Sequence, residues 1–170
     1  MRVITAPEPL KIEDDELSVF LAGGIQKTED WQKIVISELG KRFSSEKVVI
    51  FNPRRENFPI GDPSAAYKQI KWEYDALDLA DVFTMYFSKG KTDEPICMYE
   101  YGKHLERRSE NDDLSDFVVT SDPEYRRYQD VLIQSELVNK DIKVGNTLED
   151  HINRISEVIE KNIEALKSLR

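Results

Sequence analysis

Glu100 lies in a sequence context that could support nucleophilic or acid–base chemistry. It falls in the mostly apolar stretch 96–101, and Pro95 can open a helix that carries it. Apolar surroundings exclude water and raise the pKa of a carboxyl group, which suits proton transfer near neutral pH. His104, four residues later, would face Glu100 on that helix. An ordinary surface glutamate is the alternative interpretation.

A second group of carboxylates precedes a predicted strand at residues 81–87. Glu73 lies on a predicted helix that leads directly into this strand, and Asp75, Asp78 and Asp81 follow it. Asp75 and Asp78 fit a solvated acidic face, and Asp81 could cap or start the strand. Glu73 stays a catalytic candidate beside Glu100.

Two adjacent arginines follow another predicted strand, in the segment Asn52-Pro-Arg-Arg55. Guanidinium groups match phosphate and carboxylate oxygens through paired hydrogen bonds. One interpretation is that Arg54 or Arg55 binds an anionic group of a ligand. The other is that they pair with surface acids such as Glu56 or Asp62, and spacing alone does not decide between the two.

Gly23 and Gly24 follow the first apolar run. Adjacent glycines allow the backbone to approach a ligand closely. The segment is not a G-x-G-x-x-G dinucleotide motif, and no acidic ribose-binding residue follows a second strand. A ligand-binding role therefore rests on its location, and a tight turn between strand and helix is the alternative.

Short continuous apolar runs alternate with amphipathic segments, which predicts alternating strands and helices. We expect strands at 18–22, 47–51, 81–87, 117–120 and 142–144. We expect helices after a Thr28 cap, at about 67–79, 95–108 and 123–138, and after a Thr147–Asp150 capping box. The apolar stripes include Ile70, Tyr74 and Leu77 in the second helix and Ile152, Ile155, Ile159, Ile163, Leu166 and Leu169 in the last. Residues 1–16 should be a loose N-terminal arm, and residues 109–115 a polar surface loop.

Continuous rather than alternating apolar strands predict a mostly parallel sheet of about five strands, covered by helices on both faces. The length of 170 residues fits one α/β domain over residues 1–170. Ligands of such sheets bind beyond the carboxyl ends of the strands. The segments expected there are 23–26, 52–55, 87–94 and 120–125.

Composition narrows the possible partners. The net charge of −9 argues against a nucleic acid polymer or an anionic membrane as a partner, and no run is long and apolar enough to span a bilayer. The single cysteine, Cys97, and the lack of a signal-peptide pattern predict a cytoplasmic protein. Two isolated histidines do not suggest a zinc site, so we expect no metal or redox cofactor.

Taken together, these segments resemble the nucleoside 2-deoxyribosyltransferase-like superfamily. The resemblance covers about residues 18–155, and the order and spacing of its short motifs carry it. The motifs are Phe20-Leu-Ala-Gly-Gly-Ile25, Asp30-Trp-Gln32, Asn52-Pro-Arg-Arg55, Trp72-Glu73, Ala76-Leu77, Ala80-Asp-Val82, Pro95-Ile96, Tyr99-Glu100, Gly102, Tyr125-Arg-Arg127, Asp130-Val131 and Gln134.

The resemblance implies a Rossmann-like three-layer sandwich and an enzyme that transfers or hydrolyses N-glycosidic bonds. Its nucleophile position matches Glu100, and two further acid positions match Glu73 and Glu94. The implied substrate is a nucleoside or nucleotide. The candidate residues for binding it are Gly23, Gly24, Trp31, Asn52, Arg54 and Arg55. The resemblance also implies a homo-oligomer whose subunits complete each other's sites, and the sequence offers the aromatic segment 125–128 for that contact.

Other function classes stay open beside this one. A non-catalytic nucleotide-binding or sensor module on the same fold would bind the ligand without breaking it. A protein-interaction domain that uses the acidic surface and the last helix is a third reading. Free base released from a nucleoside would separate the enzyme from both.

Overall fold

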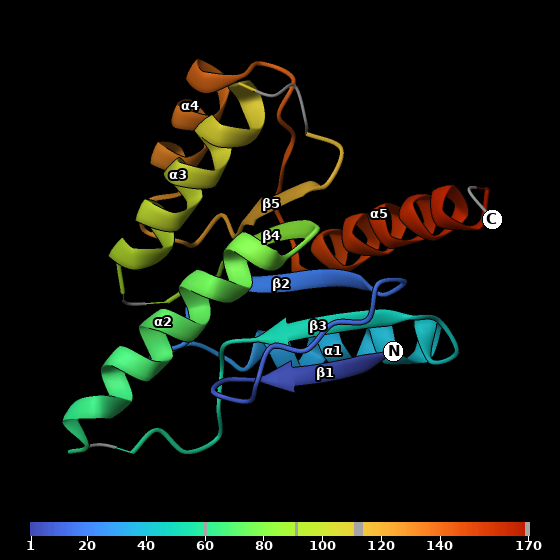
Figure 1. Cartoon of the computed structure of the whole chain (residues 1–170). Coiled ribbons are helices and arrows are strands. Elements are labelled where there is room, and N and C mark those ends of the chain that lie inside the picture. Colours follow the sequence, from blue (N-terminus) through green and yellow to red (C-terminus); the bar gives the residue numbers. More distant parts are fainter. Residues whose placement is uncertain (60, 91, 111–113, 169–170) are drawn as a thin grey trace.

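The computed structural model describes residues 1–59, 61–90, 92–110 and 114–168 (Figure 1). Its strands are β1 (Arg2–Thr5), β2 (Leu17–Gly23), β3 (Val48–Asn52), β4 (Val82–Phe87), β5 (Phe117–Ser121) and β6 (Val144–Gly145). Its helices are α1 (Trp31–Phe43), α2 (Pro63–Leu79), α3 (Pro95–Glu110), α4 (Tyr128–Val138) and α5 (Leu148–Ser168). Residues 111–113 of the predicted polar loop and Leu169 of the predicted last stripe lie outside the described residues.

The strands form one parallel sheet in the order β1-β3-β2-β4-β5-β6. In central β2, Val19 lies opposite Ile50 of β3 and Val82 of β4. Every residue of β2 and β4 is buried, as expected for strands covered on both faces. The predicted α/β class with a parallel sheet is confirmed, and the described sheet has one strand more than the five predicted.

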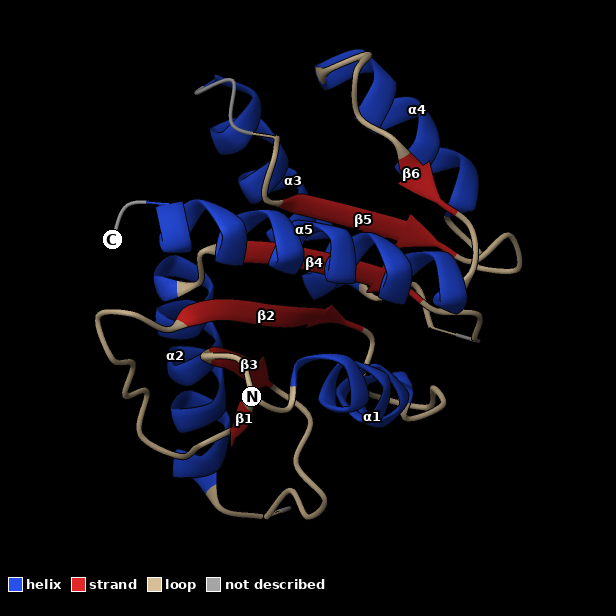
Figure 2. Ribbon diagram, turned by 90° about the vertical axis from the view of Figure 1, so that its right-hand side faces the viewer, coloured by secondary structure: helices blue, strands red, loops and turns tan. Residues whose placement is uncertain are grey.

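Helices cover both faces of this sheet (Figure 2). On one face, α1 and α5 pack against the strands through residues that include Trp31 and Ile155. On the other face, α2, α3 and α4 contribute Trp72, Tyr101 and Val131 to a second core. The arrangement is therefore the three-layer Rossmann-like sandwich that the sequence predicted.

The prediction of a loose arm over residues 1–16 is wrong for its first part. Residues 2–5 form β1 at the edge of the sheet, where Ile4 pairs with Phe51 and is only 4% exposed. Arg2 also forms an ion pair with Glu16 at 2.6 Å. Two prolines and an acidic cluster suggested a loop, but a four-residue edge strand needs little apolar sequence to pair.

The predicted Thr28 cap of α1 is also wrong. Asp30 caps this helix by accepting a hydrogen bond from the Lys33 N–H at 3.1 Å. The Thr28 hydroxyl instead donates to the Gly24 carbonyl at 2.9 Å, within the loop. Residues 24–30 therefore form a loop between β2 and α1, and the hydrogen bond from Thr28 to Gly24 joins two of its residues. The sequence did not predict this loop.

The helix predicted to begin at Pro123 begins at Tyr128 instead. The preceding residues form successive turns, because the N–H of Tyr125 donates to Asp122 and that of Tyr128 donates to Tyr125. Tyr125 is 2% exposed and belongs to the core of its own chain. It is therefore buried where the sequence suggested an aromatic group offered to a neighbouring subunit.

The strand order places a topological switch between β2 and β4. The chain moves from β2 to β3 on one side and from β4 to β5 on the other, so the loops that follow β2 and β4 diverge. Such a divergence opens a crevice at the carboxyl edge of a parallel sheet, which is where ligands bind in this class of fold.

Candidate active site

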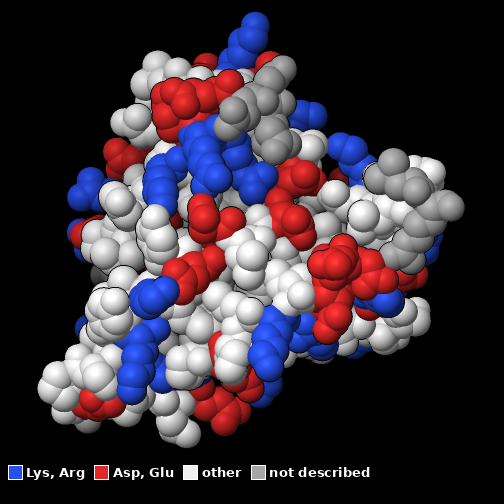
Figure 3. Space-filling view, viewed as in Figure 1, with Lys and Arg blue, Asp and Glu red and all other residues white. Residues whose placement is uncertain are grey.

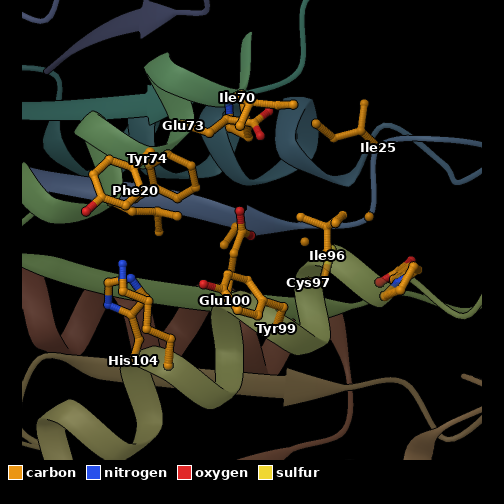
Figure 4. Close-up of a pocket in the computed structure, with 18 of the residues that line it drawn as sticks. Phe20, Ile25, Ile70, Glu73, Tyr74, Ile96, Cys97, Tyr99, Glu100 and His104 are labelled. Carbon is orange, nitrogen blue, oxygen red and sulfur yellow. The ribbon is translucent and has the colours of Figure 1, made fainter. Parts of the chain in front are cut away.

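A cavity of about 560 Å³ occupies this crevice (Figure 4). It lies between α2, α3 and the loop after β2, with Phe20 and Ala22 of β2 among its lining residues. Its size falls within the range of small-molecule sites. All three predicted catalytic carboxylates, Glu73, Glu94 and Glu100, line it.

Glu73 and Glu100 enter the cavity from opposite walls, one on α2 and the other on α3 (Figure 4). Burial and the neighbouring Glu73 charge raise the pKa of Glu100 from its usual 4.5 to about 7. Burial also raises the pKa of Glu73, and a hydrogen bond from Gln69 partly offsets this. The Gln69 amide donates to Glu73 Oε1 at 2.6 Å and to the Pro53 carbonyl at 2.8 Å, which orients the carboxylate.

Glu94 is the most enclosed of the three carboxylates, with an exposed fraction of 7%. Burial raises its pKa to about 7, against the smaller effects of the Ser88 hydroxyl and the Gly24 backbone. Its φ of 44° is left-handed, a conformation that costs energy for a residue with a side chain and concentrates at functional sites. Two carboxyl groups of this cavity, on Glu94 and Glu100, thus have a pKa close to neutrality.

The glycine pair after β2 makes room for this carboxylate. A Cβ atom on Gly24 would lie 1.9 Å from Oε1 of Glu94. A Cβ atom on Gly23, whose φ is 147°, would lie 2.3 Å from the Tyr86 carbonyl. Both glycines line the cavity. A side chain at position 23 would meet fixed backbone, whereas one at position 24 would displace the Glu94 carboxyl group.

The segment after β5 holds the residue that precedes Glu94. The Tyr125 hydroxyl donates to the Asp93 carbonyl at 2.7 Å, and its ring stacks on Phe87 with 5.1 Å between centroids. Arg126 and Arg127 each lie 3.6 Å from the Asp93 carboxylate. This support for Glu94 was not foreseen from the sequence, although the motif 125–127 was noted there.

Two of the predicted substrate-binding residues, Trp31 and Asn52, lie behind the cavity wall. Trp31 is 1% exposed, and its indole N–H donates to the Gly24 carbonyl at 3.0 Å. The Asn52 side chain accepts a hydrogen bond from the Arg54 N–H at 3.1 Å. Neither residue lines the cavity, so a direct contact with a ligand stays a prediction.

The two arginines also lie outside the lining of the cavity. Arg54 donates to the loop between β2 and α1, and Arg55 lies over the Phe58 ring at 4.7 Å. Nε of Arg54 and both Nε and Nη2 of Arg55 are buried without a hydrogen-bond partner among the described residues. Since these atoms have almost no accessible surface, binding of an anion through them also stays a prediction.

Four large side chains at the cavity were missed as site residues. Ile70 and Tyr74 on α2 were predicted to face the core, but they are 65% and 60% exposed. Ile96 and Tyr99 on α3 are similarly exposed, and all four line the cavity. Helical spacing of apolar residues predicts a buried stripe, and it cannot separate a core from the wall of a cavity.

His104 lies on the same side of α3 as Glu100, as the helical spacing predicted, and both residues line the cavity. The His104 ring stacks on Phe83 with 4.6 Å between centroids, and burial lowers its pKa to about 4. It therefore contributes a neutral ring to the cavity lining. Gly102, next to Tyr101 on the same helix, has no described atom within 4 Å of the place a Cβ would occupy, so no close approach explains it.

The charges around the cavity are mostly negative. Among the described lining residues, Lys103 is the single Lys or Arg, and its ammonium lies 4.6 Å above the Tyr74 ring. On the face seen in Figure 1, acidic and basic side chains form several small groups that lie next to one another (Figure 3). The described residues contain no group of three His, Cys, Asp or Glu side chains arranged to bind a metal ion, and no described helix could cross a membrane.

No curated protein matches the chain. A family model described as "nucleoside 2-deoxyribosyltransferase like" matches residues 16–111, a shorter range than the 18–155 over which the sequence motifs extend. That range covers more than half of the 170 residues and includes Gly23, Gly24, Glu73, Glu94 and Glu100. The chain therefore belongs to the nucleoside 2-deoxyribosyltransferase-like family.

Proposed function

We propose that this chain breaks or exchanges the N-glycosidic bond of nucleosides, with Glu100 as the nucleophile. The observation that carries the proposal is that Glu73, Glu94 and Glu100 share one cavity, and that Glu94 and Glu100 both have a pKa of about 7. Departure of a base from a sugar needs a carboxylate that traps the sugar and an acid that protonates the base. Near neutral pH, these two groups can each be present in the required form.

In the first step, the ionised Glu100 carboxylate bonds to the anomeric carbon of the sugar. The carbon–nitrogen bond breaks, and its electron pair stays on the base nitrogen. We assign protonation of the base to Glu94, because it is the more enclosed acid and Glu73 is already held by Gln69. Glu73 faces Glu100 across the cavity, where its oxygens could accept hydrogen bonds from the sugar hydroxyls (Figure 4).

In the second step, water or another base attacks the anomeric carbon. The attacking group loses a proton to Glu94, and the ester bond to Glu100 breaks to restore its carboxylate. Water gives hydrolysis, whereas a second base gives exchange. Both outcomes use the same residues, so the choice depends on which acceptor enters the cavity.

We propose an unphosphorylated nucleoside as the substrate. A 5′-phosphate would enter a cavity lined by three carboxyl groups and, among the described residues, by the single cation of Lys103. The negative charge of a phosphate and that of an ionised carboxylate repel each other within one cavity, and this repulsion increases as water is excluded. The Arg55 charge already lowers the pKa of Glu73, but the unpaired nitrogens of Arg54 and Arg55 are buried and would contact a phosphate only after rearrangement.

A panel of nucleosides and their 5′-monophosphates, assayed for free base, tests this function. We expect base release from at least one nucleoside, and base exchange when a second base is added. Glu100→Gln should lower turnover by about 10³-fold or more, with binding kept within a few-fold. Glu106→Gln, which changes an exposed glutamate on the same helix, is the matched control. Intact nucleoside bound but never cleaved would instead support the sensor module.

We also propose that the chain is a cytoplasmic homo-oligomer, as its family suggests. Support comes from the exposed side chains of Ile70, Tyr74, Ile96 and Tyr99 around the cavity, which a neighbouring subunit could cover. Exposed apolar patches of this kind often mark contact surfaces. Light scattering at micromolar concentration should give a mass above that of one chain, and a fully active monomer would exclude the idea.

A further inference from the structure

The loop of residues 24–30, between β2 and α1, forms one wall of the cavity and includes an unusual backbone conformation. Gly24, Ile25 and Gln26 line the cavity. The next residue, Lys27, has a φ of 56°, which is left-handed. A residue with a side chain keeps this conformation only where surrounding contacts hold it. The contacts that hold the loop of residues 24–30 therefore decide whether this wall keeps its shape.

Arg54 supplies such contacts from the end of β3. Its Nη2 donates to the Ile25 carbonyl at 2.6 Å and to the Thr28 hydroxyl at 2.7 Å, and lies 3.4 Å from the Gly24 carbonyl. Its Nη1 lies 3.5 Å from the Asp30 carboxylate. The guanidinium group thus reaches both ends and the middle of the loop. Its side chain is only 12% exposed, so water competes weakly for these bonds.

These contacts meet at the peptide that adjoins the proposed acid. The Gly24 carbonyl accepts from the Thr28 hydroxyl at 2.9 Å and the Trp31 indole at 3.0 Å, in addition to its approach by Arg54. Gly24 in turn packs directly against the Glu94 carboxyl group. A shift of this peptide would change the space and the hydrogen bonding of Glu94.

We propose that Arg54 is a positioning residue, which fixes the loop of residues 24–30 against Glu94 and does not bind the substrate. An arginine suits this position because its planar group donates in several directions at once. A lysine would keep the charge but could not reproduce the fork. The structural part of this proposal is independent of the proposed function, and only its kinetic consequence rests on it.

Trypsin cleavage after Lys27 tests the structural part. This residue is exposed, and cleavage of a folded loop requires it to open. Loss of charge-assisted bonds in Arg54→Ala should speed cleavage after Lys27 by about 10- to 100-fold, with Arg54→Lys in between. Arg42→Ala is the matched control, because Arg42 bridges α1 to Ser156 and Asn153 of α5, away from the cavity. Equal cleavage after Lys27 in Arg54→Ala and the unaltered chain would overturn the proposal.

Kinetics then separate positioning from substrate binding. We expect Arg54→Ala to lower kcat about 10- to 100-fold with KM changed only a few-fold. Added methylguanidinium should restore part of the rate and slow the cleavage after Lys27, since it replaces the missing group. A 10- to 100-fold rise in KM confined to nucleoside 5′-monophosphates would overturn the proposal in favour of phosphate binding. If no nucleoside is cleaved at all, the proposed function fails while the proteolysis result still decides the role of Arg54.

Discussion

Replacing Glu100 by glutamine should stabilise the folded chain at alkaline pH even as it removes the proposed reaction. In the folded chain, burial and the Glu73 charge raise the pKa of Glu100 to about 7, against 4.5 in the absence of these effects. The protonated form is thus favoured by folding. The protonated Glu100 carboxyl group contributes to the free energy of unfolding, and this contribution is fully present below pH 4.5 and is lost as pH rises through 7. Glutamine does not titrate and avoids this loss.

The size of the effect follows from the two pKa values. At pH 5 the folded chain retains most of the advantage of holding a neutral carboxyl group, and at pH 8 almost none is left. The difference in unfolding free energy between Glu100→Gln and the unaltered chain should therefore grow by about 2.5 kcal/mol from pH 5 to pH 8. Relaxation of the cavity or entry of water would reduce this figure, so we take it as an upper value.

Urea unfolding of both proteins at pH 5, 6, 7 and 8, at constant ionic strength, measures this difference. Glu106→Gln serves as the control, since this exposed glutamate of α3 should show a much smaller pH dependence. A difference between Glu100→Gln and the unaltered chain that does not change with pH would refute the reasoning. It would mean that Glu100 ionises as it does in water, and the cavity would then lack its proposed nucleophile environment.

Three further substitutions test other parts of the account. Gly24→Ala should lower turnover by about 10²-fold or more, because the new Cβ would lie 1.9 Å from Glu94 Oε1; unchanged turnover would show that the exact position of this carboxyl group is unimportant. Gly102→Ala, the matched glycine change on an exposed part of α3, should raise the unfolding free energy by about 1 kcal/mol, unless another subunit packs there. Burial lowers the pKa of His151 to about 3, so this ring is neutral in the folded chain and stability should fall as pH drops below about 6.5, by up to about 1.4 kcal/mol per pH unit. His151→Gln should remove that slope in urea unfolding between pH 6 and 4, and parallel curves for the two proteins would contradict the prediction.

The sheet could be predicted because its strands are continuous apolar runs. Burial on both faces leaves no polar alternation in β2 or β4, and this pattern is readable without a structure. The cap of α5 was equally clear, and the Thr147 hydroxyl accepts a hydrogen bond from the Asp150 N–H at 3.0 Å. In contrast, β1 is short and lies at an edge, so its pairing depends on β3 more than on its own residues.

The site was only partly predictable. Glu73 and Glu100 could be selected as candidates from their helical contexts, but Glu94 emerged through the family resemblance, since nothing local marks a residue held at positive φ before a proline. Some residues lie next to the cavity without lining it, and their roles depend on which loop they contact in the folded chain. Arg54 is an example, because its partners are 24 to 30 residues away in sequence and meet it only in the folded chain.

The central claim is that Glu100 forms a covalent bond to the sugar. A 2-deoxy-2-fluoro nucleoside analogue should slow release of the sugar from the enzyme, because fluorine disfavours the cationic transition state of that step. Incubation with this analogue, followed by mass spectrometry of the intact chain and of its peptides, tests the claim directly. The account predicts one added sugar per chain, attached to Glu100 and absent in Glu100→Gln. A sugar attached to Glu73 or Glu94, or turnover of the parent nucleoside retained by Glu100→Gln, would contradict it.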